Sequence, residues 1–380
     1  MSVRPTVLQL RYRDDRMRIT CNQYIEAFTP RFRTVVVFLT GQENAAGEVS
    51  GDEVRFLDLE SGDLKGLRLK ARRLLAEVVA EEKPVLVLAH RWKSAPLAVS
   101  ALNRAGLETV PVFAVVHALG QMRSFSRALV GRFVLKKRCR FIGVSEAVKN
   151  DILDSGFGLL PEEVLALPNA IDIEATTAAF LPRRQAREEL GLPPEVPVAG
   201  HIGRLVSAKD QAALIASFAR LRERVPQARL VLIGAGRLEE KLRCQVEDLG
   251  LDRAVIFSGA VDRAFRLLKA FDLFALTSVT EGFPRVLLEA MVARLPIVAT
   301  DAGGIREALG GDFELCRPGD VEGIATAIEK ILVADDACRR ELGEKNFQRV
   351  REHFSSTIFR ERLLGFAARA GVAMPEESGE

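Results

Sequence analysis

Short β-rich runs alternate with helical patterns along the whole chain, and this alternation is the strongest constraint on its fold. Such a pattern predicts an α/β architecture, in which parallel strands are joined by crossover helices. In the first half we expect strands near 6–10, 34–40, 54–59, 84–90, 110–117, 141–145 and 163–167. In the second half we expect strands near 196–202, 228–234, 254–258, 272–277, 296–300 and 312–316.

The length of 380 residues predicts two domains, because a single core rarely exceeds about 200 residues. We expect two Rossmann-like domains, over 1–172 and 196–355, joined by a linker at 173–195 that is rich in proline and charge. Ligands in open α/β sheets bind at the carboxyl ends of the strands, so a cleft between the domains is the expected site. The tail 375–380 is acidic and is expected to be disordered.

Composition argues against several classes of protein. The longest apolar runs, such as 84–89, fall far short of the roughly 18 residues that a membrane-spanning helix needs. Charge at Arg4 and Arg11 comes too early for the apolar core of a signal peptide. Five cysteines without a C-x-x-C pair argue against a disulfide framework or a cysteine zinc site. We therefore expect a cytoplasmic protein with reduced thiols.

Two carboxylates, Glu281 and Glu289, bracket a turn and a proline that precede an apolar helical run, in the sequence EGFPRVLLEA. Proline suits the first position of a helix, so Glu281 is expected just before the helix and Glu289 inside it. A helix N-terminus attracts phosphate, and carboxylates accept hydrogen bonds from sugar hydroxyls. The segment predicts a nucleotide-sugar pocket, although Glu281 alone could be an ordinary acidic residue at a helix start.

A second cationic loop follows the strand VPVAGHI. Ser207 and Asp210 match a capping box, which would place Lys209 in the first turn of the next helix. Arg204, Lys209 and a helix N-terminus would then converge on one spot, as a diphosphate requires. Taken alone, the loop is better explained as a solvated connection between a strand and a helix, and the pairing with the glutamate segment favours the phosphate site.

Together these motifs resemble the signature of the retaining glycosyltransferases of family 4, which have the GT-B fold. HIGRLVSAKD (201–210) resembles the donor-phosphate loop of that family, LPNAID (167–172) its interdomain segment and GVSEAVKND (143–151) a stretch of its first domain. The resemblance is strong over about 141–333 and weak before residue 80. It implies acceptor binding by 1–172, nucleotide-sugar binding by 196–355, and a last helix, within 356–380, that crosses back to the first domain.

The resemblance also implies residue roles. Glu281 is expected to contact the transferred sugar near the reacting centre, and Glu289 to hold the ribose hydroxyls. His117, which ends an apolar strand, is expected to contact the donor sugar, whereas the similarly placed His90 is better explained as a core residue. Further donor contacts are expected at Gly203, Arg204, Lys209, Phe283, Val286, Leu287 and Glu289.

The chain contains no D-x-D motif, so we expect a metal-independent reaction without a cofactor, in which cationic side chains neutralise the leaving group. Gly234 and Gly236 lack the third glycine of a dinucleotide fingerprint, which argues against a nicotinamide enzyme. Gly303 and Gly304 resemble a turn of the family, but a simple tight turn explains them nearly as well.

No acidic residue occurs between Thr109 and Ser145, a window that contains the basic segment 123–140. On a helix, Phe125, Leu129, Val130 and Phe133 would share one side, among basic residues. Basic amphipathic helices bind anionic membrane surfaces, although a packed helix with a solvated basic face gives the same pattern. Nothing in the chain resembles a nucleic-acid-binding module.

The chain departs from the family in two places. The glycine-rich loop that follows the first strand in relatives is replaced by RYRDDRMRITCNQY (11–24), which has no glycine and is cationic. This change suggests an anionic acceptor and leaves the geometry of the acceptor site open. Arg294 stands where relatives end a helix with glycine, the usual residue for that position.

We therefore predict a hexosyltransferase-type retaining glycosyltransferase. It would move a sugar from a nucleotide-sugar donor, which we expect to be a UDP-sugar, to a cell-envelope glycan or glycolipid such as lipopolysaccharide core, at the inner face of the plasma membrane. A sugar-nucleotide epimerase of the same fold and a catalytically silent partner in envelope assembly are the alternatives. The donor sugar, the acceptor hydroxyl and the oligomeric state do not follow from the sequence.

Overall fold

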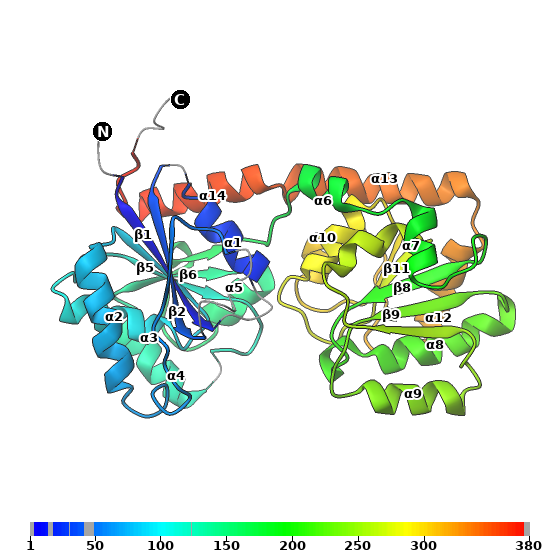
Figure 1. The fold of residues 1–380 in the computed structure, drawn as a ribbon, viewed down its shortest axis with the longest axis horizontal. Coiled ribbons are helices and arrows are strands. Elements are labelled where there is room, and N and C mark those ends of the chain that lie inside the picture. Colours follow the sequence, from blue (N-terminus) through cyan, green and yellow to red (C-terminus); the bar gives the residue numbers. More distant parts are fainter. Residues whose placement is uncertain (1–3, 14–17, 30, 42–48, 123, 376–380) are drawn as a thin grey trace. The chain divides into compact units, whose positions relative to one another are not determined.

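The computed structural model describes residues 4–13, 18–29, 31–41, 49–122 and 124–375, and the chain forms two compact units. Unit 1 comprises Met1–Asn169 together with Ser356–Glu380, and unit 2 comprises Ala170–Ser355. Each unit is built on its own parallel sheet with helices packed around it (Figure 1). The predicted α/β fold class is therefore confirmed.

Within the part of unit 1 that the structure describes, the sheet has seven strands in the order β3-β2-β1-β4-β5-β6-β7, and every neighbouring pair is parallel. The strands are β1 (Thr6–Arg13), β2 (Arg33–Thr40), β3 (Glu53–Phe56), β4 (Leu86–His90), β5 (Val112–Val116), β6 (Cys139–Gly143) and β7 (Val164–Ala166). The central strands β4 and β5 are buried along their whole length. Near-continuous apolar runs such as VFAVV are what a parallel sheet covered on both faces requires.

The described residues of unit 1 form six α-helices: α1 (Arg18–Glu26), α2 (Leu69–Glu82), α3 (Ala95–Arg104), α4 (Phe125–Val130), α5 (Glu146–Leu153) and α14 (Ser356–Arg369). The last of them comes from the far end of the chain. Its Phe366 ring lies 5.0 Å from that of Phe113 in β5, and its Phe359 ring lies 4.9 Å from that of Tyr24 in α1. The core of unit 1 is thus completed by residues that follow unit 2 in sequence.

The sheet of unit 2 has the order β10-β9-β8-β11-β12, with every neighbouring pair parallel. Its strands are β8 (Val198–Ile202), β9 (Arg229–Ile233), β10 (Val255–Gly259), β11 (Leu273–Leu276) and β12 (Ile297–Ala299). Its helices are α6 (Ile173–Ala179), α7 (Arg183–Glu189), α8 (Gln211–Arg224), α9 (Glu239–Asp248), α10 (Arg285–Val292), α11 (Ile305–Leu309), α12 (Val321–Leu332) and α13 (Asp336–His353). Apolar side chains from α8, α9 and α12 pack with those of the strands into one core cluster.

The segment 173–195, which the sequence predicted to be a linker, is instead part of unit 2 and contains α6 and α7. The buried side chain of Arg187 explains this difference. It bonds the carboxylate of Asp272 at 2.9 Å and the carbonyl oxygens of Ala270 and Val196 at 3.0 Å each. This clamp ties α7 to the beginnings of β8 and β11.

The strand predicted near 312–316 does not form. Only Cys316 pairs with the sheet, through an isolated bridge to Thr300, and most of the segment is exposed or half-buried. The other strands are apolar runs that can be buried, whereas this segment carries the charged residues Asp312 and Glu314. The described sheet of unit 2 therefore ends at β12.

The basic segment 123–140 does not form one continuous helix. Helix α4 ends at Val130 and a π-helical turn, Gly131–Leu135, follows it. A Cβ atom on Gly131 would lie 2.2 Å from the ring of Phe157, so the turn packs directly against that ring. The π-helical turn leaves the side chain of Phe133 on the surface, where it is 73% accessible.

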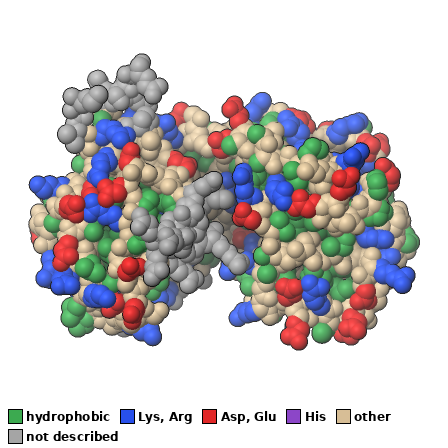
Figure 2. All heavy atoms as spheres, viewed as in Figure 1, with side chains coloured by type: hydrophobic (Ala, Val, Ile, Leu, Met, Phe, Trp, Pro, Cys, Tyr) green, Lys and Arg blue, Asp and Glu red, His purple; other side chains and the backbone are tan. Residues whose placement is uncertain are grey.

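Within the described residues, every helix is too short or too polar to cross a lipid bilayer. On the face drawn in Figure 2, charged side chains of both signs are mixed and hydrophobic ones are scattered among them.

Candidate functional site

Loops that follow β8, β9, β11 and β12 converge at the carboxyl end of the sheet of unit 2. The N–H of Gly203 donates to the carbonyl of Ile233 at 2.9 Å, which joins the first two loops. The N–H of Val279 donates to the carbonyl of Ala208 at 2.9 Å, which joins the first to the third. The predicted donor residues therefore lie at the edge where open α/β sheets bind their ligands.

The cationic loop after β8 differs in one detail from its prediction. Asp210, rather than Ser207, caps α8 by accepting the N–H of Ala213 at 3.3 Å, and the helix begins at Gln211. Lys209 lies in the 3₁₀ turn Ser207–Lys209 before the helix. The reason is the left-handed backbone of Asp210, at φ 46°, which separates the turn from the helix. Arg204 is exposed, and its guanidinium has no protein partner within the described part of the chain.

Lys209 and Glu281 are brought into direct contact although 72 residues separate them in sequence. The Nζ atom of Lys209 lies 2.5 Å from Oε1 of Glu281, and the hydroxyl of Ser278 donates to the same oxygen at 2.6 Å. Both charged side chains are largely buried, at 15% and 12% accessibility. The carboxylate of Glu281 is therefore held by two donors rather than left mobile in a loop.

Backbone carbonyls support this arrangement from below. The hydroxyl of Thr277 donates to the carbonyls of Lys209 and Asp210 at 3.2 and 3.1 Å. The hydroxyl of Thr300, at the end of β12, donates to the carbonyl of Ser278 at 2.6 Å. Both threonines are fully buried, so these bonds fix the loop against the sheet.

Helix α10 begins immediately after this loop. Its first residue is Arg285, and Pro284 occupies the capping position without a side-chain hydrogen bond. This corrects the expectation that the proline would be the first helical residue. The first N–H groups of α10 point out of the helix start, where a phosphate group would find donors and a partial positive charge.

Glu289 lies inside α10, as predicted, and most of its side chain is buried. Its Oε1 atom accepts a hydrogen bond from Nε of Arg285 at 3.3 Å. Burial raises the pKa of Glu289, and Arg285 partly opposes that shift. A carboxylate in such surroundings gains stability from further hydrogen-bond donors, such as the hydroxyls of a sugar.

The other residues predicted to bind donor are less exposed. Phe283 is 5% accessible, and its ring lies 5.2 Å from that of Phe354. Leu287 is fully buried in the core, whereas Val286 is half-buried on the first turn of α10. Within unit 2, Leu287 therefore supports the helix rather than presenting a ligand-binding surface.

Glycines permit the close approach of these loops. The backbone of Gly234 has φ 145°, and a Cβ atom there would lie 1.9 Å from the carbonyl oxygen of Gly203. A Cβ atom on Gly304 would lie 2.2 Å from the carbonyl oxygen of Gly282. Gly234 and Gly304 are thus needed to bring these loops together.

A buried histidine lies directly beneath the cationic loop. Nδ1 of His201 faces the carbonyl of Ala275 at 2.9 Å, so Nδ1 carries the proton. The amide nitrogen of Gln211 donates to Nε2 of His201 at 3.1 Å and to the carbonyl of Arg204 at 2.8 Å. Burial lowers the pKa of His201 to about 4, and the nearby charge of Lys209 contributes to this shift. Neutral His201 therefore anchors the loop that carries Arg204.

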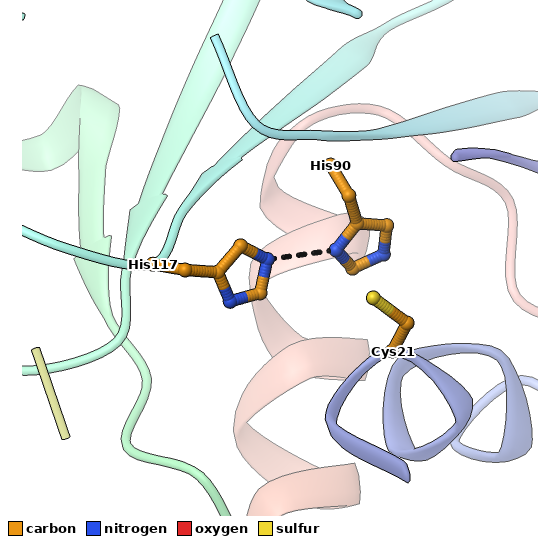
Figure 3. A group of neighbouring side chains, drawn as sticks. All are labelled: Cys21, His90 and His117. Atoms are coloured by element: carbon orange, nitrogen blue, oxygen red, sulfur yellow. Dashed lines mark hydrogen bonds between the residues drawn. The ribbon is translucent and has the colours of Figure 1, made fainter. Parts of the chain in front are cut away.

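In unit 1, His90 and His117 come together at the ends of β4 and β5 (Figure 3). Nδ1 of His90 and Nε2 of His117 are 3.0 Å apart. The amide nitrogen of Gln9 lies 2.8 Å from Nε2 of His90 and 2.7 Å from the carbonyl of Cys21. Burial, above all, lowers the pKa of His90 well below its usual value, so this ring is neutral.

Cys21, His90 and His117 are the described residues that could best hold a metal ion, because their ligand atoms lie within 4.8 Å of one another. A metal on Nδ1 of His90 would require the proton on Nε2 of that ring. Nε2 faces the amide N–H of Gln9, so two donors would then meet. The hydrogen bonds therefore fit a neutral histidine pair better than a metal centre.

The glycine-free segment 11–24 lies only partly within the described residues, because 14–17 fall outside them. Arg11 is 2% accessible and lies 4.8 Å from the ring of Phe38, so this cation belongs to the interior of unit 1. It therefore does not support the inference of an anionic acceptor.

Three residues of the two clusters described above, one in unit 1 and two in unit 2, were not identified from the sequence. Ser278 had a usable signal, since it precedes Glu281 by three residues, the spacing of a local side-chain bond. Gln9 and Gln211 had weaker ones: Gln9 is a single amide in an apolar strand, and Gln211 is an amide at a helix start.

Comparisons with known proteins agree with this architecture. The family model described as "Glycosyl transferases group 1" matches residues 182–349, and the one described as "Glycosyl transferase 4-like domain" matches residues 17–170. The Campylobacter jejuni N-acetylgalactosamine-N,N'-diacetylbacillosaminyl-diphospho-undecaprenol 4-alpha-N-acetylgalactosaminyltransferase is 28% identical over 248 residues, which are 64% of this chain and 65% of that protein. The lipopolysaccharide core biosynthesis glycosyltransferase LpsE of Rhizobium meliloti is 33% identical over 184 residues, which are 48% of this chain and 53% of that protein.

Among solved structures, Anabaena HepE in complex with UDP and glucose superposes with a TM-score of 0.79 at 21% identity, covering 96% of this chain and 100% of that one. The chain spans about two thirds or less of the length of the curated relatives it matches. The two family models together cover most of the chain, and their boundary falls close to that between 1–169 and unit 2. The chain therefore belongs to the GT-B glycosyltransferases of the family-4 type.

Proposed function

We propose that this protein is a retaining glycosyltransferase of the hexosyltransferase type, which moves a sugar from a UDP-sugar to a cell-envelope glycan or glycolipid. The observation that carries the proposal is the contact of Lys209 and Ser278 with Glu281 at the strand ends of unit 2. A carboxylate held by two donors is a fixed negative group beside a helix start suited to phosphate. Binding and cleavage of a sugar diphosphate require both: a negative group near the sugar and a positive site for the diphosphate.

The proposed chemistry depends on stabilising the departing diphosphate. Arg204, Lys209 and the first N–H groups of α10 would bear the charge that develops on it, without a metal ion or a cofactor. Glu281 would lie near the sugar carbon and stabilise its developing positive charge. Glu289 would accept the ribose hydroxyls, and His117 would contact the transferred sugar.

UDP is the proposed nucleotide because HepE was solved with UDP and with UDP-glucose. Thermal unfolding with UDP, GDP, ADP, CMP and NAD tests this choice. A nucleotide at about 100 times its Kd stabilises the folded protein by about 2.7 kcal/mol. We expect a shift with UDP that is lost in Arg204→Ala. A shift with another nucleotide would replace UDP, and none with any nucleotide would favour a silent partner in envelope assembly.

The role of Glu281 is tested by Glu281→Gln, which keeps the shape of the side chain. We expect UDP binding to be retained and sugar transfer to fall by roughly 10²–10³-fold, as when one electrostatic stabiliser is removed. Glu314→Gln is the matched control, since Glu314 is 92% accessible and lies in the same unit. Unchanged transfer in Glu281→Gln would refute the assignment. Epimerisation of the donor without an acceptor would favour the epimerase instead.

A glycolipid acceptor, such as lipopolysaccharide core, is proposed from the surface of unit 1 around α4. Leu129, Phe133 and Val134 are 42%, 73% and 42% accessible, and exposed Arg132 and Lys137 lie among them. Apolar side chains surrounded by cations suit the surface of an anionic membrane, with about 1 kcal/mol for each cation. We therefore propose that the enzyme works at the inner face of the plasma membrane. Arg123 and the side chain of Phe125 lie outside the described residues.

Vesicle sedimentation tests the membrane proposal. We expect binding to vesicles with anionic lipid, weaker binding to neutral vesicles, and a clear loss in Phe133→Ser. Val333→Ser is the matched control, because Val333 is 64% accessible but lies in unit 2. Equal binding of all proteins to both vesicle types would exclude this surface as the membrane contact.

A further inference from the structure

The hydrogen bonds around His90 assign the proton positions of two histidines in unit 1. The amide nitrogen of Gln9 lies 2.7 Å from the carbonyl oxygen of Cys21, so this end of the amide is the donor. The opposite orientation would set two oxygens against each other at that distance. Nε2 of His90 lies 2.8 Å from the same amide nitrogen and must therefore accept its second N–H.

The remaining proton positions follow from this one. Neutral His90 has a single ring proton, and with Nε2 as acceptor that proton lies on Nδ1. Nδ1 then donates to Nε2 of His117, 3.0 Å away. Because Nε2 of His117 accepts, the proton of a neutral His117 lies on its Nδ1. The rings are nearly parallel, with 21° between their planes, which is compatible with an in-plane N–H···N bond between them (Figure 3).

We propose that Gln9 and His90 are positioning residues that fix His117 as its Nδ1–H tautomer, so that His117 acts as a hydrogen-bond donor to an oxygen of the transferred sugar. The inference rests on the proposed function for the sugar contact alone, since the tautomer follows from the geometry of unit 1. His117 would then hold the sugar rather than remove a proton from the acceptor.

Packing supports a positioning role for His90. Its side chain is 2% accessible, and its ring lies edge-on to that of Tyr24, with centroids 5.1 Å apart. His117 is half-buried at the end of β5 and so is the member of the relay nearest solvent. A ring that cannot reach a ligand can still act through one that can, by holding its proton and its orientation.

Nuclear magnetic resonance of ¹⁵N-histidine-labelled protein tests the tautomers directly, since the chain has four histidines and few signals to assign. We expect both His90 and His117 to be protonated at Nδ1. A wild-type spectrum with the proton on Nε2 of either ring would overturn the proposal without any variant. In Gln9→Met, which removes both amide donors, His90 and His117 should change to mixed tautomers.

Gln211→Met is the matched control for the spectrum, because it removes the corresponding amide beside His201 in unit 2. It should change the signals of His201 only. In Gln9→Met, unchanged His201 signals show that unit 2 has folded. If the tautomers of His90 and His117 persist in Gln9→Met, Gln9 does not fix them and the proposal fails.

Transfer kinetics test the consequence for the sugar. We expect Gln9→Met and His90→Leu to lower kcat/KM for the donor by roughly tenfold to a hundredfold, as a misplaced binding group does, while stabilisation by UDP is retained. His90→Asn should recover most of the loss, because its amide N–H replaces the Nδ1 donor. No recovery by His90→Asn, with both variants folded, would indicate a merely structural role. The expected tautomers in a wild-type protein without transfer would support the relay and refute the proposed function.

Discussion

The ion pair between Lys209 and Glu281 leads to a quantitative prediction about the stability of unit 2. We consider Lys209→Met, Glu281→Met and the double variant. The two charged atoms lie 2.5 Å apart, and at 15% and 12% accessibility water screens them little. Each single substitution leaves one charge buried without its partner, whereas the double substitution removes both.

The expected magnitude follows from the contacts that remain. Removing one member of a buried pair costs about 3–5 kcal/mol in the free energy of unfolding. In Lys209→Met the hydroxyl of Ser278 still donates to Glu281, and a bond to a charged group contributes about 1.5–3 kcal/mol. We therefore expect the lower end, about 3 kcal/mol, for Lys209→Met. The double variant should be about 2–3 kcal/mol more stable than the sum of the two single effects predicts.

Urea unfolding followed by far-ultraviolet circular dichroism measures all four proteins. The only tryptophan, Trp92, lies in unit 1, so its fluorescence serves as an internal control. Additive effects, within about 0.5 kcal/mol, would show that the pair has no coupling and would refute the view that Lys209 holds Glu281 in place.

Other features give three further predictions. Gly234→Ala should abolish stabilisation by UDP, because its Cβ would lie 1.9 Å from the carbonyl oxygen of Gly203; Gly250→Ala, also at positive φ but without a neighbour within 4 Å, should retain it. Arg294→Gly should change the midpoint of unfolding little, because glycine adopts the left-handed backbone at φ 56° without strain, and this gain offsets the lost contact of the guanidinium with an aromatic ring 3.6 Å away. A decrease of more than about 2 kcal/mol in the free energy of unfolding would contradict this balance. The pKa of His201 is about 4 in the folded protein, against 6.5 for an ordinary histidine, so the unfolded chain binds the proton first as pH falls. The free energy of unfolding should therefore decrease by on the order of 3 kcal/mol from about pH 6.5 to pH 4. Urea unfolding at several pH values measures this, and a His201→Gln variant that keeps the full pH dependence would contradict it.

Much of the fold could be predicted because its strands are continuous apolar runs. The sequence VFAVV of β5 and LVLAH of β4 can be buried on both faces only within a covered parallel sheet. Helices α6 and α7 carry no comparable signal. The position of α7 depends on the distant contact between Arg187 and Asp272, which no local pattern contains. The same holds for 312–316, where charge prevents the burial that its apolar residues suggested.

In the candidate site, too, the sequence indicates individual residues but not the contacts between them. Arg204, Lys209, Glu281 and Glu289 could be found because charged residues stood next to a strand end or a helix start. Their mutual contacts could not be predicted, since the contact of Lys209 with Glu281 depends on how two strands lie side by side in the sheet. The pairing of His90 with His117 has the same origin, in the neighbouring strands β4 and β5.

The composition of unit 1 from two distant stretches of chain has a consequence for its synthesis on the ribosome. The partners of α14, including Tyr24 and Phe113, are made early, but Phe359 and Phe366 emerge only after all of unit 2. At about 5–20 residues per second, translation of the intervening stretch takes roughly ten to forty seconds. During that time the nascent first unit exposes apolar surface while the second is still being synthesised. Molecular chaperones should therefore associate with nascent chains arrested before residue 356 more than with released full-length chains.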